Sequence, residues 1–260
     1  MNFIRSILAI IASVALALSI IGAGFLVCTL PATTNTLANF YSDDATSPFS
    51  RSQLVQVADA TRDYAFGDHN LTSLYGAVFK VDLDFRQDIL MNNGVVPYGF
   101  PDLDSVKDPG DIQQIEAAFA GASEMYCYSA QTISHLDDCF KLAQNARVIL
   151  AIGAIIALAC LIACGAMGGT RTVGKAMFAA GGIVIVLLVA GGIFAAVDFT
   201  DFFAVFHNFF FSQGNWQFSY DSLLICTLPT AFWVGMVVVW LVVSLVVSIL
   251  SIIIGKSIQK

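Results

Sequence analysis

Two apolar runs decide the fold: VILAIGAIIALACLIACGAM at positions 148–167 and MFAAGGIVIVLLVAGGIFAAV at positions 177–197. The residues between them, 168–176, include Arg171 and Lys175 and no acidic side chain. Each run has the roughly 20 residues that a helix needs to cross the ~30 Å hydrocarbon core of a bilayer. Both must be helical there, because a backbone in hydrocarbon finds no water to satisfy its polar groups. The sequence therefore predicts two membrane spans joined by a short basic loop.

Composition and two further apolar runs extend this interpretation to the whole chain. Of its 260 residues, 57% are hydrophobic and only 12% are charged, against roughly 25% charged in soluble domains. The remaining long apolar runs cover residues 1–30 and 223–254. The first is also compatible with a cleaved signal peptide, but its apolar stretch exceeds the ~7–15 residues of signal sequences. We therefore expect a retained anchor and an integral membrane, mainly α-helical protein with four transmembrane helices.

The charges predict how these helices are oriented. Loops that stay in the cytoplasm are enriched in Lys and Arg, and basic residues without acidic ones occur near the N-terminus, in 168–176 and in the tail 255–260. The segments 31–147 and 198–222 contain all 19 acidic residues and seven basic ones, a net charge of −12. We therefore expect a multi-pass protein of the cell membrane with cytoplasmic N- and C-termini. Its acidic outer side argues against nucleic acid as a partner.

The segment 31–147 is long enough to fold as an extracytoplasmic domain. Its beginning, Thr33–Pro48, has no clear periodicity, whereas Ser52–Phe66 has the apolar spacing of a helix. Val78–Phe85 alternates between charged and apolar residues, which is typical of a half-buried strand. Asp111 is placed to open a helix through Phe119, and a last helix begins near Ser129 and continues into the second span. These patterns predict an α+β domain between the first two membrane helices.

Several classes of function are disfavoured by what the sequence lacks. It contains no P-loop, no Gly-x-Gly-x-x-Gly, no Gly-x-Ser-x-Gly and no His-Glu-x-x-His. No carboxylate lies within a predicted span, which argues against an ion-coupled transporter. None of the six cysteines has metal-ligand spacing with a histidine, although Cys127 and Cys139 are predicted outside, where a disulfide can form. We expect neither a metal nor a cofactor.

The three histidines are the remaining candidates for chemistry. His207 lies in the short segment 198–222, among eight phenylalanines and Trp216, so we expect it at the membrane interface and partly desolvated. A desolvated imidazole is neutral, as a general base must be, although a packed interfacial histidine would look the same. His135 shares a helix face with Asp138, which is either an orienting carboxylate or an ordinary surface partner. His69 lies in a polar turn and is expected to be solvated.

Two motifs that contain the histidines at 135 and 207 are similar to motifs of a known membrane-protein family. The segment FHNFFFSQGNWQFSYDSLLICTLP at positions 206–229 is similar to the family's connection between spans three and four, with its Phe-His, Gly-Asn-Trp and Leu-Pro elements. SHLDDC at positions 134–139 resembles its second motif, His-Met-x-Asp-Val, with Leu136 and Cys139 in place of Met and Val. ADATRDYAFG at positions 58–67 is similar to a weaker family feature. The family that these segments resemble is a bacterial four-span membrane family that includes the lipoprotein intramolecular transacylase. The stretch 74–124 has no counterpart that we recognise.

The resemblance implies an enzyme that moves the sn-2 acyl chain of a diacylglyceryl-cysteine onto the α-amine of the same cysteine. It implies that His135 and His207 are catalytic, that membrane lipids and a diacylated lipoprotein are the partners, and that no cofactor takes part. Asp138, Asn215 and Trp216 are supporting candidates. A helix rising from His135 to Val148 gains about 20 Å, so the two histidines meet only if this helix tilts or the outer domain folds down. The alternative function is a non-enzymatic envelope protein, a sensor or an assembly factor.

Overall fold

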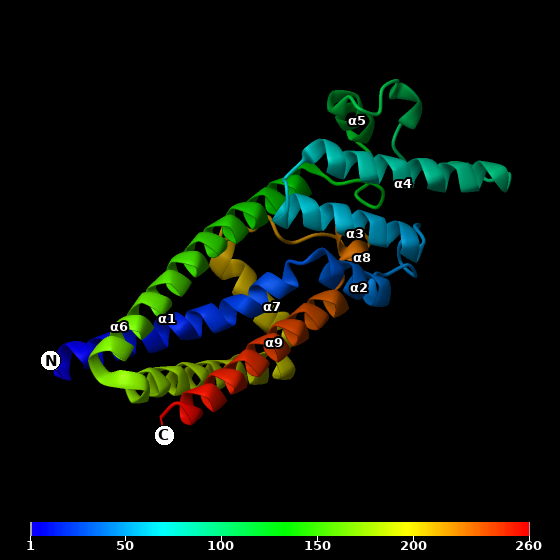
Figure 1. Cartoon of the computed structure of the whole chain (residues 1–260). Coiled ribbons are helices and arrows are strands. Elements are labelled where there is room, and N and C mark those ends of the chain that lie inside the picture. Colours follow the sequence, from blue (N-terminus) through cyan, green and yellow to red (C-terminus); the bar gives the residue numbers. More distant parts are fainter. Residues whose placement is uncertain (1, 260) are drawn as a thin grey trace. The chain divides into compact units, whose positions relative to one another are not determined.

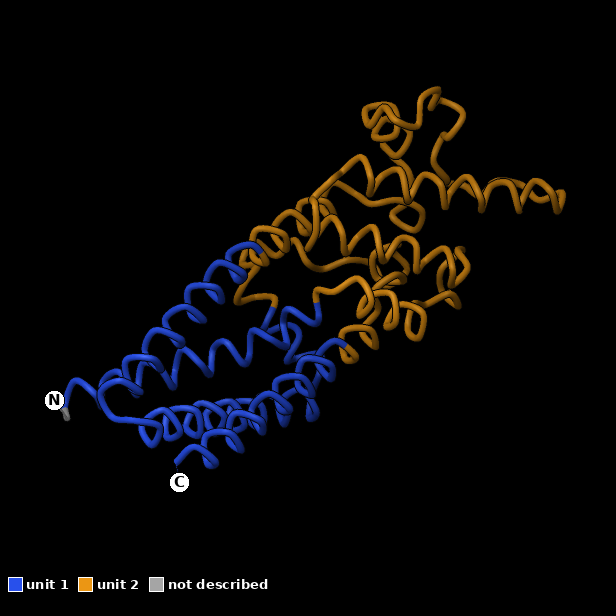
Figure 2. Tube along the Cα trace, viewed as in Figure 1, with its two compact units in different colours: residues 1–28, 144–206, 236–260 blue, residues 29–143, 207–235 orange. Residues whose placement is uncertain are grey.

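The computed structural model describes residues 2–259, and within them it is helical with no β-strand (Figure 1). The chain forms two compact units, which are coloured separately in Figure 2. The first contains residues 1–28, 144–206 and 236–260, and the second contains residues 29–143 and 207–235. The expectation of a mainly α-helical protein is therefore confirmed.

The first unit contains the long apolar helices. Among the described residues, three helices are long and apolar enough to cross a membrane: α1 (Asn2–Cys28), α6 (Ala130–Val197) and α9 (Thr230–Ser257). The last of these begins later than the apolar run 223–254, because Pro229 removes a backbone donor and separates α9 from α8 (Leu223–Thr227). Within α6, Gly169 has φ 68° and ψ −176°, a conformation open essentially only to glycine. Figure 1 shows the ribbon doubling back within α6.

Small residues let the helices of this unit approach closely, as is usual between membrane helices. A Cβ added to Gly24 would lie 2.3 Å from Cδ1 of Trp240, whose Nε1 donates to the carbonyl of Ile21 at 3.0 Å. The buried centre comprises Ala17, Ile20, Ala180, Val184 and Leu188. Large apolar side chains cover much of the outer surface, among them Ile10, Ile155 and Val186, which are 64%, 68% and 68% exposed. A surface of this kind places the protein in a membrane.

The second unit is a cluster of shorter helices. It consists of α2 (Pro31–Tyr41), α3 (Arg51–Phe66), α4 (Leu71–Met91), η1 (Leu103–Ser105), α5 (Ile112–Phe119), the beginning of α6, the last residues of α7 (Phe199–Phe210), and α8. Helix α3 packs against α2, α4 and α8, and α5 packs against α4. Leu54, Val57, Val78 and Leu223 are almost completely buried between them. The helices expected over 52–66 and 111–119 and from residue 129 onward are confirmed.

The expected strand at Val78–Phe85 is wrong, because these residues belong to α4. The buried residues Leu74, Val78 and Val81 recur at intervals of four and three, the spacing of one helix face. An eight-residue window was too short to distinguish this spacing from alternation. Asn70 also caps the helix, accepting from Ser73 N at 3.0 Å. The α+β description of the outer domain is corrected accordingly, since the described part of this domain contains helices and loops and no strand.

The irregular beginning expected at Thr33–Pro48 is also partly wrong, because α2 covers its first half. Pro31 stands at the start of α2, where its missing N–H costs nothing. Thr34, Leu37 and Ala38 are buried on one face of this helix. Packing against α3 thus stabilises a helix whose Thr- and Asn-rich sequence favours it only weakly.

Asp82 is an ionisable group in the core of the second unit. Its side chain is completely buried, and neither carboxyl oxygen has a hydrogen-bond partner in the described part of the chain. Burial raises the pKa of Asp82 to about 9, whereas an unfolded aspartate titrates near 3.9. Between these values the folded chain holds one more proton than the unfolded chain. The free energy of unfolding therefore falls by roughly 1.4 kcal/mol per unit as the pH rises through this window.

We expect Asp82→Asn to remove this pH dependence, because the amide keeps the shape of a protonated carboxyl and does not ionise. The measurement is the apparent unfolding temperature in detergent at pH 6 and at pH 8.5. The unsubstituted protein should lose markedly more stability between these values than the variant. Asp88→Asn is the matched control, since Asp88 is exposed on the same helix. Equal losses in the unsubstituted protein and in Asp82→Asn would contradict a protonated Asp82.

Candidate active site

The structure brings His135 and His207 together within the second unit. His135 lies in the second turn of α6, and His207 lies in the last turn of α7. The centroids of their rings are 6.1 Å apart, and each residue is only 7% exposed. The geometric condition for a histidine pair is therefore met, although the two residues lie on different helices and 72 positions apart in the sequence.

Aromatic rings surround the two imidazoles. Phe211 packs edge-on against His135 at 4.8 Å and lies 5.6 Å from His207. Phe218 lies 5.7 Å from His135, and Trp216 lies 5.0 Å from His207. The segment following α7 thus turns back and supplies three rings to the pair. This environment holds the imidazoles in apolar surroundings, where the charged form is disfavoured.

Asp138 fastens this segment to α6. Its Oδ2 accepts hydrogen bonds from Nε2 of Gln213 and, at 3.0 Å, from Nδ2 of Asn215. Asn215 Nδ2 also lies 3.4 Å from Ser134 Oγ, and Lys141 Nζ lies 3.4 Å from Asp138 Oδ1. Desolvation opposes ionisation of Asp138, but the hydrogen bonds from Asn215, Lys141 and Gln213 together hold its pKa below the usual value. The carboxylate is therefore charged, and it engages His135 by way of Asn215.

His135 is neutral at physiological pH. Burial, and after it the charge of His207, lowers the pKa of His135 to about 4. The charge of Asp138 and an interaction with the Asn215 side chain act in the opposite direction. A neutral imidazole offers one nitrogen as a hydrogen-bond acceptor and the other as a donor. His135 is thus equipped to accept a proton or to donate a hydrogen bond, and it is not a reservoir of positive charge.

The six cysteines and His69, the third histidine, lie outside the histidine pair. All six cysteines are free thiols, so Cys127 and Cys139 do not form the disulfide that their positions allow. Cys139 Sγ instead lies 3.6 Å from His135 Nε2. His69, expected to be solvated, is half-buried: its ring stacks between those of Tyr64 and Phe140 at 4.2 and 4.0 Å. Its Nε2 lies 3.4 Å from Asp137, on a different face of α6 from Asp138.

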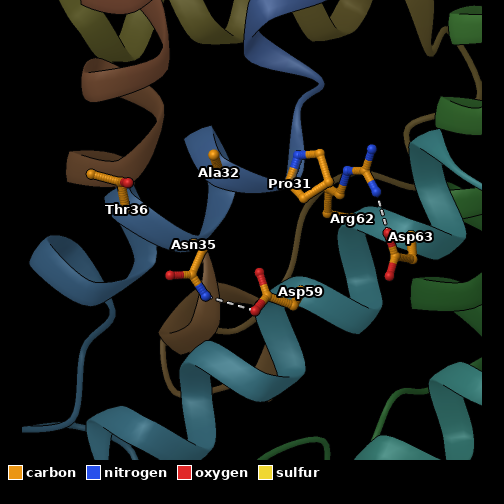
Figure 3. Close-up of a pocket in the computed structure, with 7 residues that line it drawn as sticks. All are labelled: Pro31, Ala32, Asn35, Thr36, Asp59, Arg62 and Asp63. Carbon is orange, nitrogen blue, oxygen red and sulfur yellow. Dashed lines mark hydrogen bonds and ion pairs between the residues drawn. The ribbon is translucent and has the colours of Figure 1, made fainter.

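A cavity of about 460 Å³ lies elsewhere in the second unit, and Figure 3 shows its lining. It is formed by Pro31, Ala32, Asn35, Thr36, Asp59, Arg62 and Asp63, with none of the five candidate site residues among them. Asn35 donates to Asp59 at 2.8 Å, and Arg62 pairs with Asp63 and donates to the carbonyl of Thr29. The segment 58–67 contributes these charges, and their bonds to Asn35 and to the carbonyl of Thr29 join α3 to the residues that follow α1.

Comparison with known proteins gives a family. Residues 112–233 match the model of the Lit family, whose description is lipoprotein intramolecular transacylase Lit. The chain carries a Lit domain, and the family predicted from its sequence is confirmed. All five candidate residues lie inside the Lit domain, whereas the segment 58–67 and residues 74–111 lie before it.

A solved structure extends the likeness to the whole fold. The chain is similar to the membrane integral lipoprotein intramolecular transacylase Lit from Bacillus cereus, with a TM-score of 0.70. The likeness covers 99% of this chain and 97% of the other at 15% identity, which establishes the fold alone. A search of the curated proteins finds no match.

Sequence reasoning missed two contacts of the candidate site. Gln213 was not a candidate, because its bond to Asp138 depends on how the segment after α7 folds back. Cys139 was considered as a disulfide partner of Cys127 and as a departure from the family pattern, although its spacing of four from His135 on a helix predicts a contact between the two side chains. The helical spacing was therefore a usable signal for Cys139, whereas Gln213 gave none.

We expect Asp138→Asn to loosen residues 211–222. The amide replaces the charged acceptor shared by Asn215 and Gln213, and one of its two positions is itself a donor. Amide hydrogen exchange in detergent should become faster in this segment, while the exchange of α3 stays unchanged. Asp137→Asn is the matched control, because Asp137 is the next residue on α6 and binds Tyr64 instead. Unchanged exchange over 211–222 in Asp138→Asn would contradict the anchoring role.

Proposed function

We propose that this chain is a lipoprotein intramolecular transacylase of the cell membrane and that His135 and His207 are its catalytic residues. The observation that carries the proposal is the meeting of the two rings, 6.1 Å apart, inside the matched Lit domain. The proposed substrate is a diacylated lipoprotein held among membrane lipids. The fold likeness to the Bacillus cereus enzyme supports the same function.

The reaction needs proton transfer and no nucleophile from the protein. The α-amine of the lipidated cysteine attacks the carbonyl carbon of its own sn-2 ester, forming an N–C bond as the ester C–O bond breaks. The amine loses a proton, and the departing sn-2 oxygen gains one. One imidazole that takes and returns this proton, or two that share the task, contributes about 10²–10⁴-fold. Because amine and ester belong to one molecule, their proximity is largely built in.

The surroundings of the histidines suit this chemistry. The neutral state of His135 leaves the pair able to accept the proton of the amine. Asn215 is bonded to Asp138, and the ring of Trp216 lies beside that of His207. We assign to these two residues the binding of the glyceryl group or of the developing oxyanion. The exposed phenylalanines of α7, such as Phe206 and Phe209, are 45% and 79% exposed and would meet acyl chains that remain in lipid.

We propose a four-span topology for this enzyme. Helix α6 crosses the membrane twice, at 148–167 and 177–197, because Gly169 breaks it beside the basic loop 168–176. Helices α1 and α9 supply the other two spans. The excess of Lys and Arg in 168–176 and near both ends puts the termini in the cytoplasm, and the histidine pair on the opposite side.

We expect His135→Asn and His207→Asn each to lower the formation of lyso-lipoprotein by at least about 10²-fold, because each replaces an imidazole by an amide that does not take up a proton. The measurement is mass spectrometry of lipoprotein N-terminal peptides from cells with each variant. His69→Asn is the matched control: His69 has φ 57°, a conformation that asparagine tolerates, and it lies outside the pair. Full activity of either pair variant at normal abundance would disprove the role of that histidine.

We expect a reporter that is active only in the cytoplasm to work when it is fused at the C-terminus or inserted after Lys175. The same reporter inserted in the turn at Gly110 should be inactive, because this turn belongs to the outer domain. Reporter activity at Gly110, or its loss at Lys175, would contradict the proposed orientation. Western blots of each fusion control for its abundance.

A further inference from the structure

Cys139 is a polar neighbour of His135 on the same helix. It stands one helical turn further along α6, with Sγ 3.6 Å from Nε2 of the imidazole. A thiol and a valine side chain fill similar space, and they differ in that only the thiol can donate a hydrogen bond.

The direction of this hydrogen bond follows from the state of the two groups. Desolvation raises the pKa of the Cys139 thiol to about 12, so sulfur keeps its proton at physiological pH. His135 is neutral under the same conditions. The thiol is then the donor, and Nε2 must offer its lone pair. A neutral imidazole that accepts at Nε2 carries its own proton on Nδ1.

The opposite side of the ring agrees with this tautomer. His135 Nδ1 and Asn215 Oδ1 are both buried, and neither has a standard hydrogen bond in the described residues. The Asn215 side chain interacts with His135, while its Nδ2 is already held by Asp138. With a proton on Nδ1, His135 offers a donor and Asn215 Oδ1 offers an acceptor. These two groups can bond to each other, or Nδ1–H can bond to a substrate oxygen. With the proton on Nε2, two acceptors would remain buried together, which is costly.

We propose that Cys139 is a positioning residue whose S–H donates to Nε2 of His135 and fixes this ring as the Nδ1–H tautomer. As a consequence, His135 presents a neutral N–H donor toward Asn215, and His207 is the imidazole that takes the proton from the amine and returns it to the departing sn-2 oxygen. The assignment of the tautomer rests on the geometry of α6 and Asn215. The division of work between the histidines rests on the proposed function.

The thiol has a measurable effect under this proposal. A hydrogen bond to the neutral form of a base disfavours protonation. Removal of the thiol therefore makes His135 easier to protonate. A charged His135 opposes the positive charge that His207 acquires with the proton of the amine, so the acid limb of the pH–rate profile moves to higher pH. A shift of about half a pH unit corresponds to one modest hydrogen bond. Packing alone gives no such shift.

The test compares Cys139→Val with Cys139→Ser in the full-length protein. Valine keeps the volume and loses the donor, whereas serine loses volume and keeps a donor. We expect the acid limb for lyso-lipoprotein formation to move upward by about half a unit in Cys139→Val. It should stay in place in Cys139→Ser. The reverse order, with valine like the parent and serine altered, would reduce Cys139 to a packing residue and overturn the proposal.

A second measurement is independent of turnover. Nitrogen NMR of labelled histidine in detergent micelles, with His135 assigned from a His135→Asn sample, reports which ring nitrogen is protonated. We expect protonated Nδ1 in the parent and in Cys139→Ser, and a higher His135 pKa in Cys139→Val. Protonated Nε2 in the parent overturns the proposal. If the tautomer is found but the parent makes no lyso-lipoprotein, the proposed function fails and the positioning by Cys139 stands.

Discussion

The site depends on one carboxylate, Asp138, which holds a loop and a helix together. Two amide side chains from the segment after α7 donate to a single oxygen of this group, and a third partner, Lys141, lies on the helix itself. A charged acceptor strengthens such bonds to roughly twice those of neutral groups. Two neutral contacts add to this attachment: Gln131 Nε2 donates to the carbonyl of Gln217 at 2.9 Å, and Asn215 Nδ2 lies 3.4 Å from Ser134 Oγ. Asp138 supplies the charged acceptor among these contacts, so it contributes most to holding the aromatic segment against α6. The rings of Phe211, Trp216 and Phe218 take their places around the histidines because the amides between them are anchored.

The same anchor explains why two histidines distant in sequence share one environment. His135 is rigid because α6 carries it, whereas His207 is close to a helix end followed by a loop. Burial of an imidazole costs free energy when it must be charged, and this cost lowers the pKa of His135 to about 4. The low pKa keeps the imidazole neutral, which is the form that a general base needs. The charge stays on Asp138, which is partly solvated, whereas the buried ring of His135 is neutral.

Features of the fold that depend on local composition could be predicted from the sequence, whereas features that depend on contacts between distant segments could not. Long apolar runs and the charges around them depend on local composition, so the helices of the first unit were predictable. The error at Val78–Phe85 arose because the apolar residues of this short stretch fit both the two-residue repeat of a strand and the spacing of a helix. The burial of Asp82, which a strand would have placed on its solvent-facing side, shows that the helical spacing is the correct one. Helix α2 was missed because its stability comes from α3 and not from its own residues. The two histidines were predicted from motifs, while their meeting required a contact between α6 and a segment about 70 positions later, which no local pattern encodes.

The position of Cys139 illustrates where motif reasoning ends and physical reasoning continues. A motif treats cysteine in place of valine as a tolerated departure, because the two side chains are similar in size. On a helix, however, residue i+4 covers the same face as residue i, so any donor at 139 is presented to the ring at 135. A buried imidazole has two nitrogens with opposite needs, and each neighbour that satisfies one of them decides the character of the other. A substitution that leaves the packing intact can therefore change which proton His135 offers, and the chemistry of the pair is set by Asn215 on one side and Cys139 on the other.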